Sequence, residues 1–159
     1  MPLSTIDQTG ITSPVGPLVL TGVTDGSNAS AGAIGEYISS TVNAPSSGLT
    51  SGTTATVTTI SLTAGDWDVN GVFTLNFGTG ASSTQAYGSL STGTTLPSSS
   101  NGGSIYIPAT LATSSGLSLT ANPIRVNVTT TTTVYLLVLS FFSGGSLGAG
   151  GYIRARRVR

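Results

Sequence analysis

The chain has 159 residues, enough for one domain, and its few charges balance, with five Arg against five acidic residues. It contains no Cys, His or Lys, which excludes disulfides, Cys/His zinc sites, Ser-His-Asp triads and Schiff-base lysines. Gly, Ser and Thr number 22, 24 and 27, a composition that linkers share. Disordered chains, however, combine low hydrophobicity with high net charge, whereas here 38% of the residues are hydrophobic and the net charge is zero. We therefore expect a folded domain with no catalytic residues, no cofactor and no metal.

No segment is expected to enter a membrane. Residues 1–7 lack both the cationic region and the apolar core of a signal peptide. The longest apolar run, Val134–Phe142, is far shorter than the roughly 20 residues that a spanning helix needs.

Residues 1–30 differ from the rest of the chain. Pro2, Pro14 and Pro17, together with several Gly and Thr residues, predict an extended N-terminal arm that contacts neighbouring subunits or a larger assembly such as a capsid shell, in part by strand addition. The candidate contact residues of this arm are Ile6, Ile11, Val15 and Leu18.

Residues 31–159 show the period-2 alternation of β-strands. In Asp66–Phe77 apolar and polar side chains alternate, and Gly71 interrupts the apolar face, which indicates a bulge or a close backbone approach. Pro108 confines Ile105–Ile107 to a sheet edge or ends that strand. Further strands are expected at Leu18–Val23, Ile34–Val42, Ala55–Leu62, Gln85–Ser91, Leu117–Ala121, Ile124–Thr129, Val134–Phe142 and Tyr152–Val158.

Turn signals separate these strands, among them Asn122-Pro123 and the Gly-rich run Gly144–Gly151, which is expected to be a flexible connection. Turns spaced by about eight to twelve residues are typical of an all-β sandwich or barrel. With about eight to ten strands, the predicted fold is a jelly-roll-like β-sandwich of residues 31–159 behind the arm. An immunoglobulin-type sandwich is the alternative, but its Cys-Trp-Cys signature is missing.

The segment Val134–Leu139 is apolar on both of its faces. A strand in a monomeric two-sheet sandwich normally exposes one face to water. We expect one face to fill the core and the other to contact a neighbouring subunit, with threefold symmetry closing the assembly. The alternative is a central strand beneath a long loop. The candidate contact residues are Val134, Leu136 and Val138.

Four of the five cations lie within residues 154–159, after all the acidic residues. Arg is suited to bidentate pairing with carboxylates at interfaces, and a solvated strand is the alternative. The basic patch is too narrow, and too poor in interleaved aromatics, to predict nucleic-acid binding. The candidate interface cations are Arg154, Arg156 and Arg157, and their candidate salt-bridge partners, within or between subunits, are Glu36, Asp66 and Asp68.

The spacing Asp66-x-Asp68-x-Asn70-Gly71 matches half of a calcium loop, but Phe77 stands where the loop needs Glu. The two aspartates are also spaced as a glycosidase pair could be, although no further carboxylate supports this. For both patterns, the favoured interpretation is that these polar side chains form the solvent-exposed face of a strand.

Four segments taken together resemble β-rich virion proteins of tailed bacteriophages. They are Ile34–Ser40 with its GEY, Ile60–Val69 with its GDWDV, Thr132–Leu136, and Gly151–Arg159 with its closing I-x-A-R-R. The resemblance implies a trimeric jelly-roll module of the kind found in capsid decoration proteins and in tail or head fibres.

The resulting hypothesis is a homotrimeric capsid decoration protein on the virion surface, whose partners are itself and the major capsid protein or another virion protein. The alternative is a fibre module that binds a host receptor or glycan through Tyr37, Tyr87 and Tyr106. A third, weaker hypothesis is a hydrolase of cell-wall glycans that uses Asp66 and Asp68.

Overall fold

The structure is a computed structural model, and it describes residues 6–7, 10–11, 25–98, 103–108, 110 and 116–159. Two short strands, β1 (Ile6–Asp7) and β2 (Gly10–Ile11), pair with each other. The remaining strands are β3 (Tyr37–Gly48), β4 (Ala55–Leu62), β5 (Gly65–Phe77), β6 (Ser82–Ser91), β7 (Ile105–Ile107), β8 (Gly116–Val128), β9 (Thr132–Ser143) and β10 (Leu147–Arg157).

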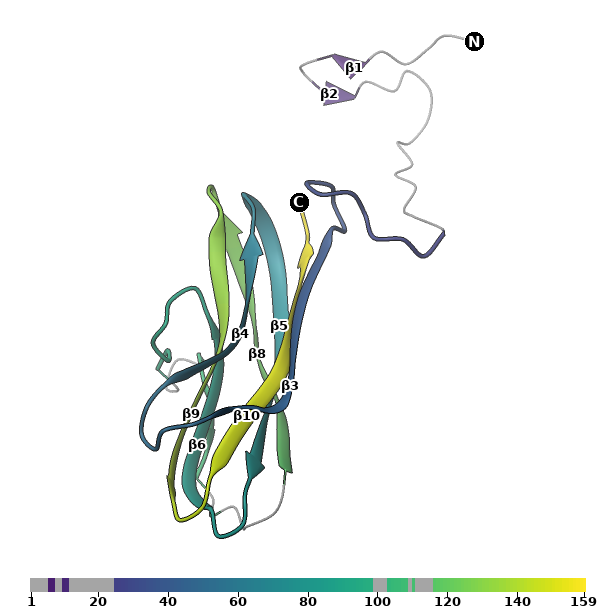
Figure 1. Ribbon diagram of the computed structural model, residues 1–159. Helices are drawn as coiled ribbons and strands as arrows, with labels where there is room; N and C mark the ends of the chain where they lie inside the picture. The colour runs from purple at the N-terminus through teal and green to yellow at the C-terminus, as the bar shows by residue number, and fades with distance from the viewer. Residues whose placement is uncertain (1–5, 8–9, 12–24, 99–102, 109, 111–115) are drawn as a thin grey trace.

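These eight strands form two four-stranded antiparallel sheets, in the orders β3-β10-β5-β8 and β4-β9-β6-β7, which pack face to face (Figure 1). The chain is arranged like one long hairpin that has been rolled up. β3 pairs with β10, β4 with β9, β5 with β8, and β6 with β7. This is the connectivity of a jelly roll, so the predicted fold class is confirmed and the immunoglobulin-type alternative is wrong.

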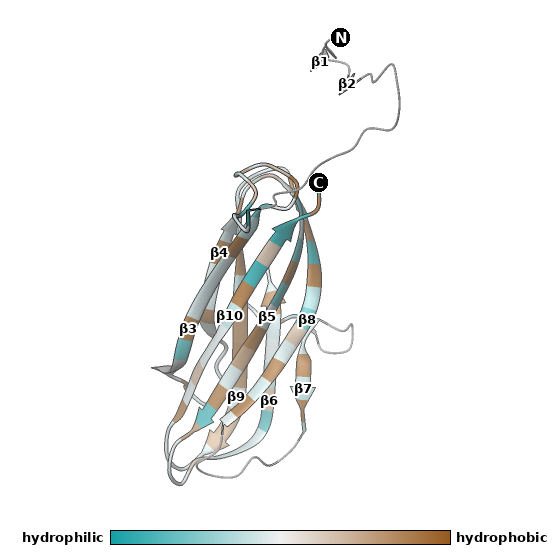
Figure 2. Ribbon diagram, turned by 90° about the vertical axis from the view of Figure 1, so that its right-hand side faces the viewer, coloured by the Kyte–Doolittle hydropathy of each residue, from teal (hydrophilic) through white to brown (hydrophobic). Residues whose placement is uncertain are grey.

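The core lies between the two sheets and follows from the alternation of the strands. Along β5 the side chains of Trp67 and Phe73 point inward and have no exposed surface, and Leu136 of β9 meets them from the other sheet. Figure 2 shows hydrophobic and hydrophilic residues alternating along β10 in the same way. Burial of these apolar faces is the main stabilising term of such a sandwich.

Several predicted elements match the structure closely. The bounds of β4 and β7 are the predicted ones, and β7 lies at a sheet edge as Pro108 requires. Gly71 stands at a register shift between β5 and β8, and a Cβ there would lie 2.7 Å from the Tyr152 carbonyl oxygen. The close backbone approach predicted at Gly71 is therefore confirmed, whereas the bulge beside Gly71 belongs to the partner strand β8.

The turn predicted at Asn122-Pro123 is wrong, because β8 runs through both residues. Val69 pairs with Ile124 and Gly71 with Ala121, so two residues of β8 oppose one residue of β5. Proline is tolerated because β8 is an edge strand and the position is a bulge.

The flexible connection predicted at Gly144–Gly151 is also shorter than expected, because β10 already begins at Leu147. Gly151 has a φ of 150°, and a Cβ there would overlap the Val72 carbonyl oxygen. At the other end of the sheet, β3 begins at Tyr37 rather than Ile34, since residues 31–35 form turns with Gly35 at a φ of 88°.

Part of the predicted arm lies outside the described residues, including Val15, Leu18 and the strand expected at Leu18–Val23. Ile6 and Ile11 are opposite each other in the pairing of β1 with β2. The described residues contain no helix of the length and apolar character that crossing a membrane requires. The last residues of the chain lie at the same end of the sandwich as the segment that leads into β3 (Figure 1).

Candidate functional site

A buried arginine holds this end of the sandwich together. Arg157, at the end of β10, is only 5% exposed and lies 2.9 Å from the carboxylate of Glu36, which is 7% exposed. Its two terminal nitrogens donate hydrogen bonds to the Ala64 carbonyl oxygen at 2.7 Å and to the Thr63 hydroxyl at 2.6 Å. Arg157 therefore ties together the segment before β3, the turn between β4 and β5, and the end of β10. The salt bridge predicted between Arg157 and Glu36 is present, within one chain.

The residues around Arg157 explain the sequence of the turn between β4 and β5. The guanidinium lies 4.3 Å from the centre of the Trp67 ring, within cation–π range. Gly65 has a φ of 150°, and a Cβ there would overlap the Arg157 guanidinium. Trp67 donates its indole N–H to the Thr63 carbonyl oxygen at 3.0 Å. Gly65 and Trp67 thus form the walls of the arginine's binding slot.

A second cluster lies beside the first, around Asp66. Its carboxylate accepts hydrogen bonds from Arg125 of β8, 2.7 Å from Nε, and forms an ion pair with Arg159 at 2.7 Å. The predicted partners of Asp66 were Arg154, Arg156 and Arg157, and the structure replaces them with Arg125 and Arg159. Arg125 was missed because only the pairing of β5 with β8 brings it to Asp66, and the sequence does not reveal that pairing.

Both carboxylates have lowered pKa values in the folded chain. The pKa of Glu36 is held below its ordinary value first by the Gly32 backbone N–H and then by Arg157, against the opposing effect of burial. The pKa of Asp66 is held down mainly by the hydrogen bond from Arg125, with a further contribution from Arg159.

These pKa values predict an acid-sensitive fold. A carboxyl with a lowered folded pKa stabilises the protein above its unfolded pKa, and this contribution is lost as pH falls through the folded pKa. We expect the unfolding temperature to change little from about pH 7 to 5 and to fall below about pH 4. Thermal unfolding of Glu36→Gln/Asp66→Asn should show a lower midpoint at neutral pH and a shallower decline in acid. A decline as steep as that of the unmodified protein would contradict this assignment.

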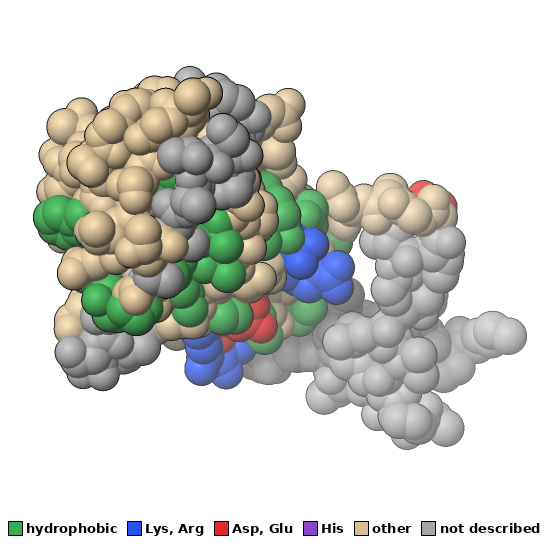
Figure 3. Space-filling view, turned by 90° about the horizontal axis from the view of Figure 1, so that it is seen from below, with side chains coloured by type: hydrophobic (Ala, Val, Ile, Leu, Met, Phe, Trp, Pro, Cys, Tyr) green, Lys and Arg blue, Asp and Glu red, His purple; other side chains and the backbone are tan. Residues whose placement is uncertain are grey.

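The sheet β4-β9-β6-β7 has an outer face without charges, because none of its four strands contains a charged residue. Phe141 and Tyr106 are 44% and 42% exposed there. Tyr87 lies between Tyr106 and Leu139 in the strand register, and its ring stacks on that of Tyr106 with 4.8 Å between centroids. We call Tyr87, Tyr106, Leu139 and Phe141 the aromatic patch. On the face seen in Figure 3, the charged side chains of the body lie toward one side, and apolar and neutral side chains cover the other described surface in view.

Part of this outer face is covered by the connection between β6 and β7. Leu96 and Pro97 of this connection line a hollow of about 280 Å³ with Tyr87, Leu139 and Phe141. Ser89 of β6 donates a hydrogen bond to the Gly103 carbonyl oxygen. The interpretation of β9 as a central strand under a loop therefore holds for this part of the face, whereas Phe141 stays exposed.

The predicted contact residues on β9 need correction. Val134, Leu136 and Val138 have no exposed surface and belong to the core of a single chain, so they cannot contact another subunit. The odd-numbered residues face away from the core, and of these Leu137 is fully buried, Leu139 is half-buried and Phe141 is exposed. Because both sets are apolar, the alternation alone could not tell which one faces the core.

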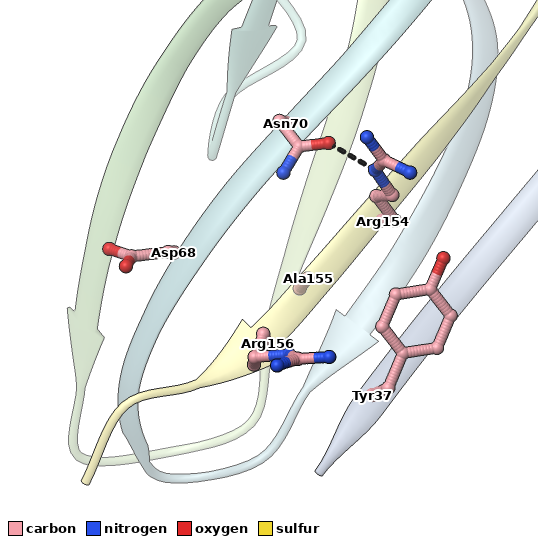
Figure 4. Close-up of a pocket in the computed structure, with 6 residues that line it drawn as sticks. All are labelled: Tyr37, Asp68, Asn70, Arg154, Ala155 and Arg156. Atoms are coloured by element: carbon pink, nitrogen blue, oxygen red, sulfur yellow. Dashed lines mark hydrogen bonds between the residues drawn. The ribbon is translucent and has the colours of Figure 1, made fainter. Parts of the chain in front are cut away.

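Arg154 and Arg156 lie on the outer face of the other sheet. Both are exposed and border a hollow of about 300 Å³ that is also lined by Tyr37 of β3. Figure 4 shows the two guanidinium groups on the same side as the Tyr37 ring. Arg154 Nε donates a hydrogen bond to the Asn70 side-chain oxygen. The structure thus brings together two of the predicted interface cations and a predicted glycan-binding tyrosine.

Asp68 does not form the salt bridge that was predicted for it. It lines the same hollow and stands opposite Arg156 in the register of β5 and β10, but its carboxylate does not point toward either guanidinium (Figure 4). No ion pair joins Asp68 to any residue that the structure describes, and the same holds for Arg154 and Arg156. The hollow is therefore lined by two cations and one carboxylate, which form no ion pair with one another and leave one excess positive charge.

The remaining chemistry predicted from Asp66 and Asp68 finds no support in their geometry. The Asp66 carboxylate is already bound by Arg125 and Arg159, whereas Asp68 is exposed without such partners. Across the described ranges, no group of three or more acidic residues could hold a metal ion. Both aspartates lie near Arg125, but only Asp66 forms an ion pair with it, and we assign them no shared chemical role.

Comparison with known proteins gives little further guidance. No protein-family model matches the chain, and no curated protein matches it. Among solved structures, a chain of "Structure of infectious bursal disease virus Gx strain" is 14% identical, with a TM-score of 0.47, over 89% of this chain and 38% of that chain. This chain therefore spans well under half the length of the viral chain. At this identity and TM-score the likeness does not extend to function.

Proposed function

We propose that the protein is a non-enzymatic structural component of a virus particle, a homotrimer that decorates a bacteriophage capsid. The observation that carries the proposal is the uncharged outer face, where Phe141 and Tyr106 stand exposed. Contiguous exposed apolar patches mark contact sites, and a surface poor in charge favours association. A closed ring of three subunits would bring three such faces around one axis.

Two further features support this role. The segments around Glu36 and Arg157 resemble virion proteins of tailed phages, and double-sheet jelly rolls occur in viral capsid domains, although also in lectins and cupins. A trimer that binds only the assembled shell would stabilise that shell by mass action. The buried contacts of Arg157 would hold one end of the sandwich together when the protein is under mechanical stress on the particle.

The oligomeric state tests the proposal. We expect a mass of three times the 15.7 kDa chain by light scattering, and binding to intact particles seen by electron microscopy. Phe141→Asp, alone or with Tyr106→Asp, should yield monomers, because a buried unpaired charge costs several kcal/mol. Thr120→Asp, on an exposed position of β8, is the matched control and should leave the trimer intact. A monomer at high protein concentration that does not bind particles would contradict the proposal.

Glycan binding is the second candidate, favoured by the stacked rings of Tyr87 and Tyr106. The Gln85 side-chain oxygen accepts a hydrogen bond from the Tyr87 hydroxyl at 3.2 Å, and so a polar group adjoins the rings. Tyr37 lies in the other sheet and does not extend this platform. A glycan array with the unmodified protein and Tyr106→Ala distinguishes the two functions, since a decoration protein should bind no glycan.

A further inference from the structure

The charges of the chain divide between its two segments. Residues 31–159 contain all five Arg but only three of the five acidic residues, whereas residues 1–30 contain Asp7 and Asp25 and no cation. The sandwich domain thus has an excess of two positive charges, and the N-terminal segment has two negative charges.

One of the two excess positive charges is located at the hollow on β10, and the other lies where Asp66 pairs with two arginines. Arg157 is neutralised by Glu36 inside one chain, and Asp66 binds two further arginines. Arg154 and Arg156 are exposed and form no ion pair among the described residues, and Asp68 is the one carboxylate among the described residues that line their hollow. Two positions apart on one strand, their Cα atoms are about 7 Å from each other.

A carboxylate fits this arrangement well. Placed between the guanidinium groups, it could accept charge-assisted hydrogen bonds from both arginines, and such bonds are roughly twice as strong as neutral ones. The Asn70 side-chain oxygen holds Nε of Arg154, which leaves the terminal nitrogens of that guanidinium for a ligand. The Tyr37 ring forms the wall on the side of β3 (Figure 4).

The hollow also lies where an extended segment can reach it. Tyr37 belongs to β3, which is the edge strand of its sheet. Edge strands carry main-chain donors and acceptors that an added strand can pair with. A segment lying along β3 would run beside the hollow and could place an acidic side chain in it.

We propose that this hollow binds the N-terminal segment of a second copy of the chain, with the Asp7 carboxylate between Arg154 and Arg156. The inference rests on the proposed self-assembly and adds a second contact to the aromatic patch. The occupant follows from charge, because residues 1–30 carry the negative charges that balance the excess on the sandwich. Asp7 is the last residue of β1 and pairs with Gly10 of β2.

Disulfide trapping tests this contact cleanly, because the chain has no Cys of its own. Ser39 is exposed and stands opposite Arg154 in the register of β3 and β10. Full-length chains with Gln8→Cys are mixed with chains with Ser39→Cys, allowed to exchange subunits, and mildly oxidised. We expect a disulfide-linked pair of unlike chains on a non-reducing gel. Thr56→Cys, exposed on the opposite sheet, replaces Ser39→Cys as the matched control and should give no such pair.

Charge reversal supplies the second arm. Arg154→Asp/Arg156→Asp should reduce the linked fraction at least tenfold, and adding Asp7→Arg to the partner chain should restore it. Equal linkage at Thr56→Cys, or no linked pair of unlike chains with Ser39→Cys, would overturn the proposed contact. Light scattering on the same mixtures separates the two proposals. A trimer without linkage overturns only the Asp7 contact, whereas a monomer overturns self-assembly as well.

Discussion

Replacing Arg157 with Met is expected to lower the free energy of unfolding by about 3–5 kcal/mol, the usual cost of breaking a buried ion pair. The substitution leaves the Glu36 carboxylate buried without its cation, and it removes the donors to Ala64 and Thr63. It also removes the guanidinium from the face of Trp67. Urea denaturation of the full-length chain measures the change.

Arg156→Met is the matched control, because Arg156 precedes Arg157 but is exposed. Surface substitutions of this kind usually change stability by less than about 0.5 kcal/mol. In the double variant Arg157→Met/Glu36→Gln the buried charge is gone, so its cost should be smaller than the sum of the two single costs. Equal costs for Arg157→Met and Arg156→Met would contradict the role assigned to Arg157.

Gly88→Ala is expected to destabilise the protein by about 1–3 kcal/mol, as overpacking of a core does. Gly88 lies on β6, and a Cβ there would overlap the ring of Phe73, which reaches across from β5 in the opposite sheet. The steric overlap involves only the new methyl group at position 88 and the Phe73 ring. Phe73→Leu in the Gly88→Ala background should therefore recover part of the lost stability. Thermal and urea denaturation of the single and double variants measure this coupling.

The control for Gly88 is Gly93→Ala, in the connection after β6. A Cβ at Gly93 would meet only the Ser91 hydroxyl, at an ordinary contact distance of 3.8 Å. Its stability should therefore stay close to that of the unmodified protein. A loss at Gly93 as large as that at Gly88 would show that the Phe73 contact is not the cause.

Local alternation in the sequence was enough to predict most strands and the fold class. The bounds of β4 and the inward face of β5 follow from it directly. Alternation failed where both faces are apolar, as at Val134–Leu139, and where a strand continues through Asn122-Pro123 by means of a bulge. In both places the structure depends on the strand or loop that packs alongside. The local sequence does not show which segment that is.

The candidate site was predictable where it depends on local alternation along a single strand. The alternation along β10 puts Arg154 and Arg156 on one face and Arg157 on the other, with Ile153 and Ala155. A cation on a buried face needs a buried carboxylate, and Glu36 was among the three partners considered. The role of Arg125 and the slot made by Gly65 depend on pairings between distant segments, so they could not be read from spacing.

The central place of β10 has a consequence for how the protein reaches its native state. β10 lies between β3 and β5, and the Glu36–Arg157 bond joins residues 121 positions apart. Contacts so distant in sequence make folding slow, on the order of milliseconds to seconds for all-β domains. Until β10 is inserted, β3 and β5 both have open edges, which could capture a strand from another molecule. Folding at high protein concentration is therefore the step at which this jelly roll is most prone to aggregate.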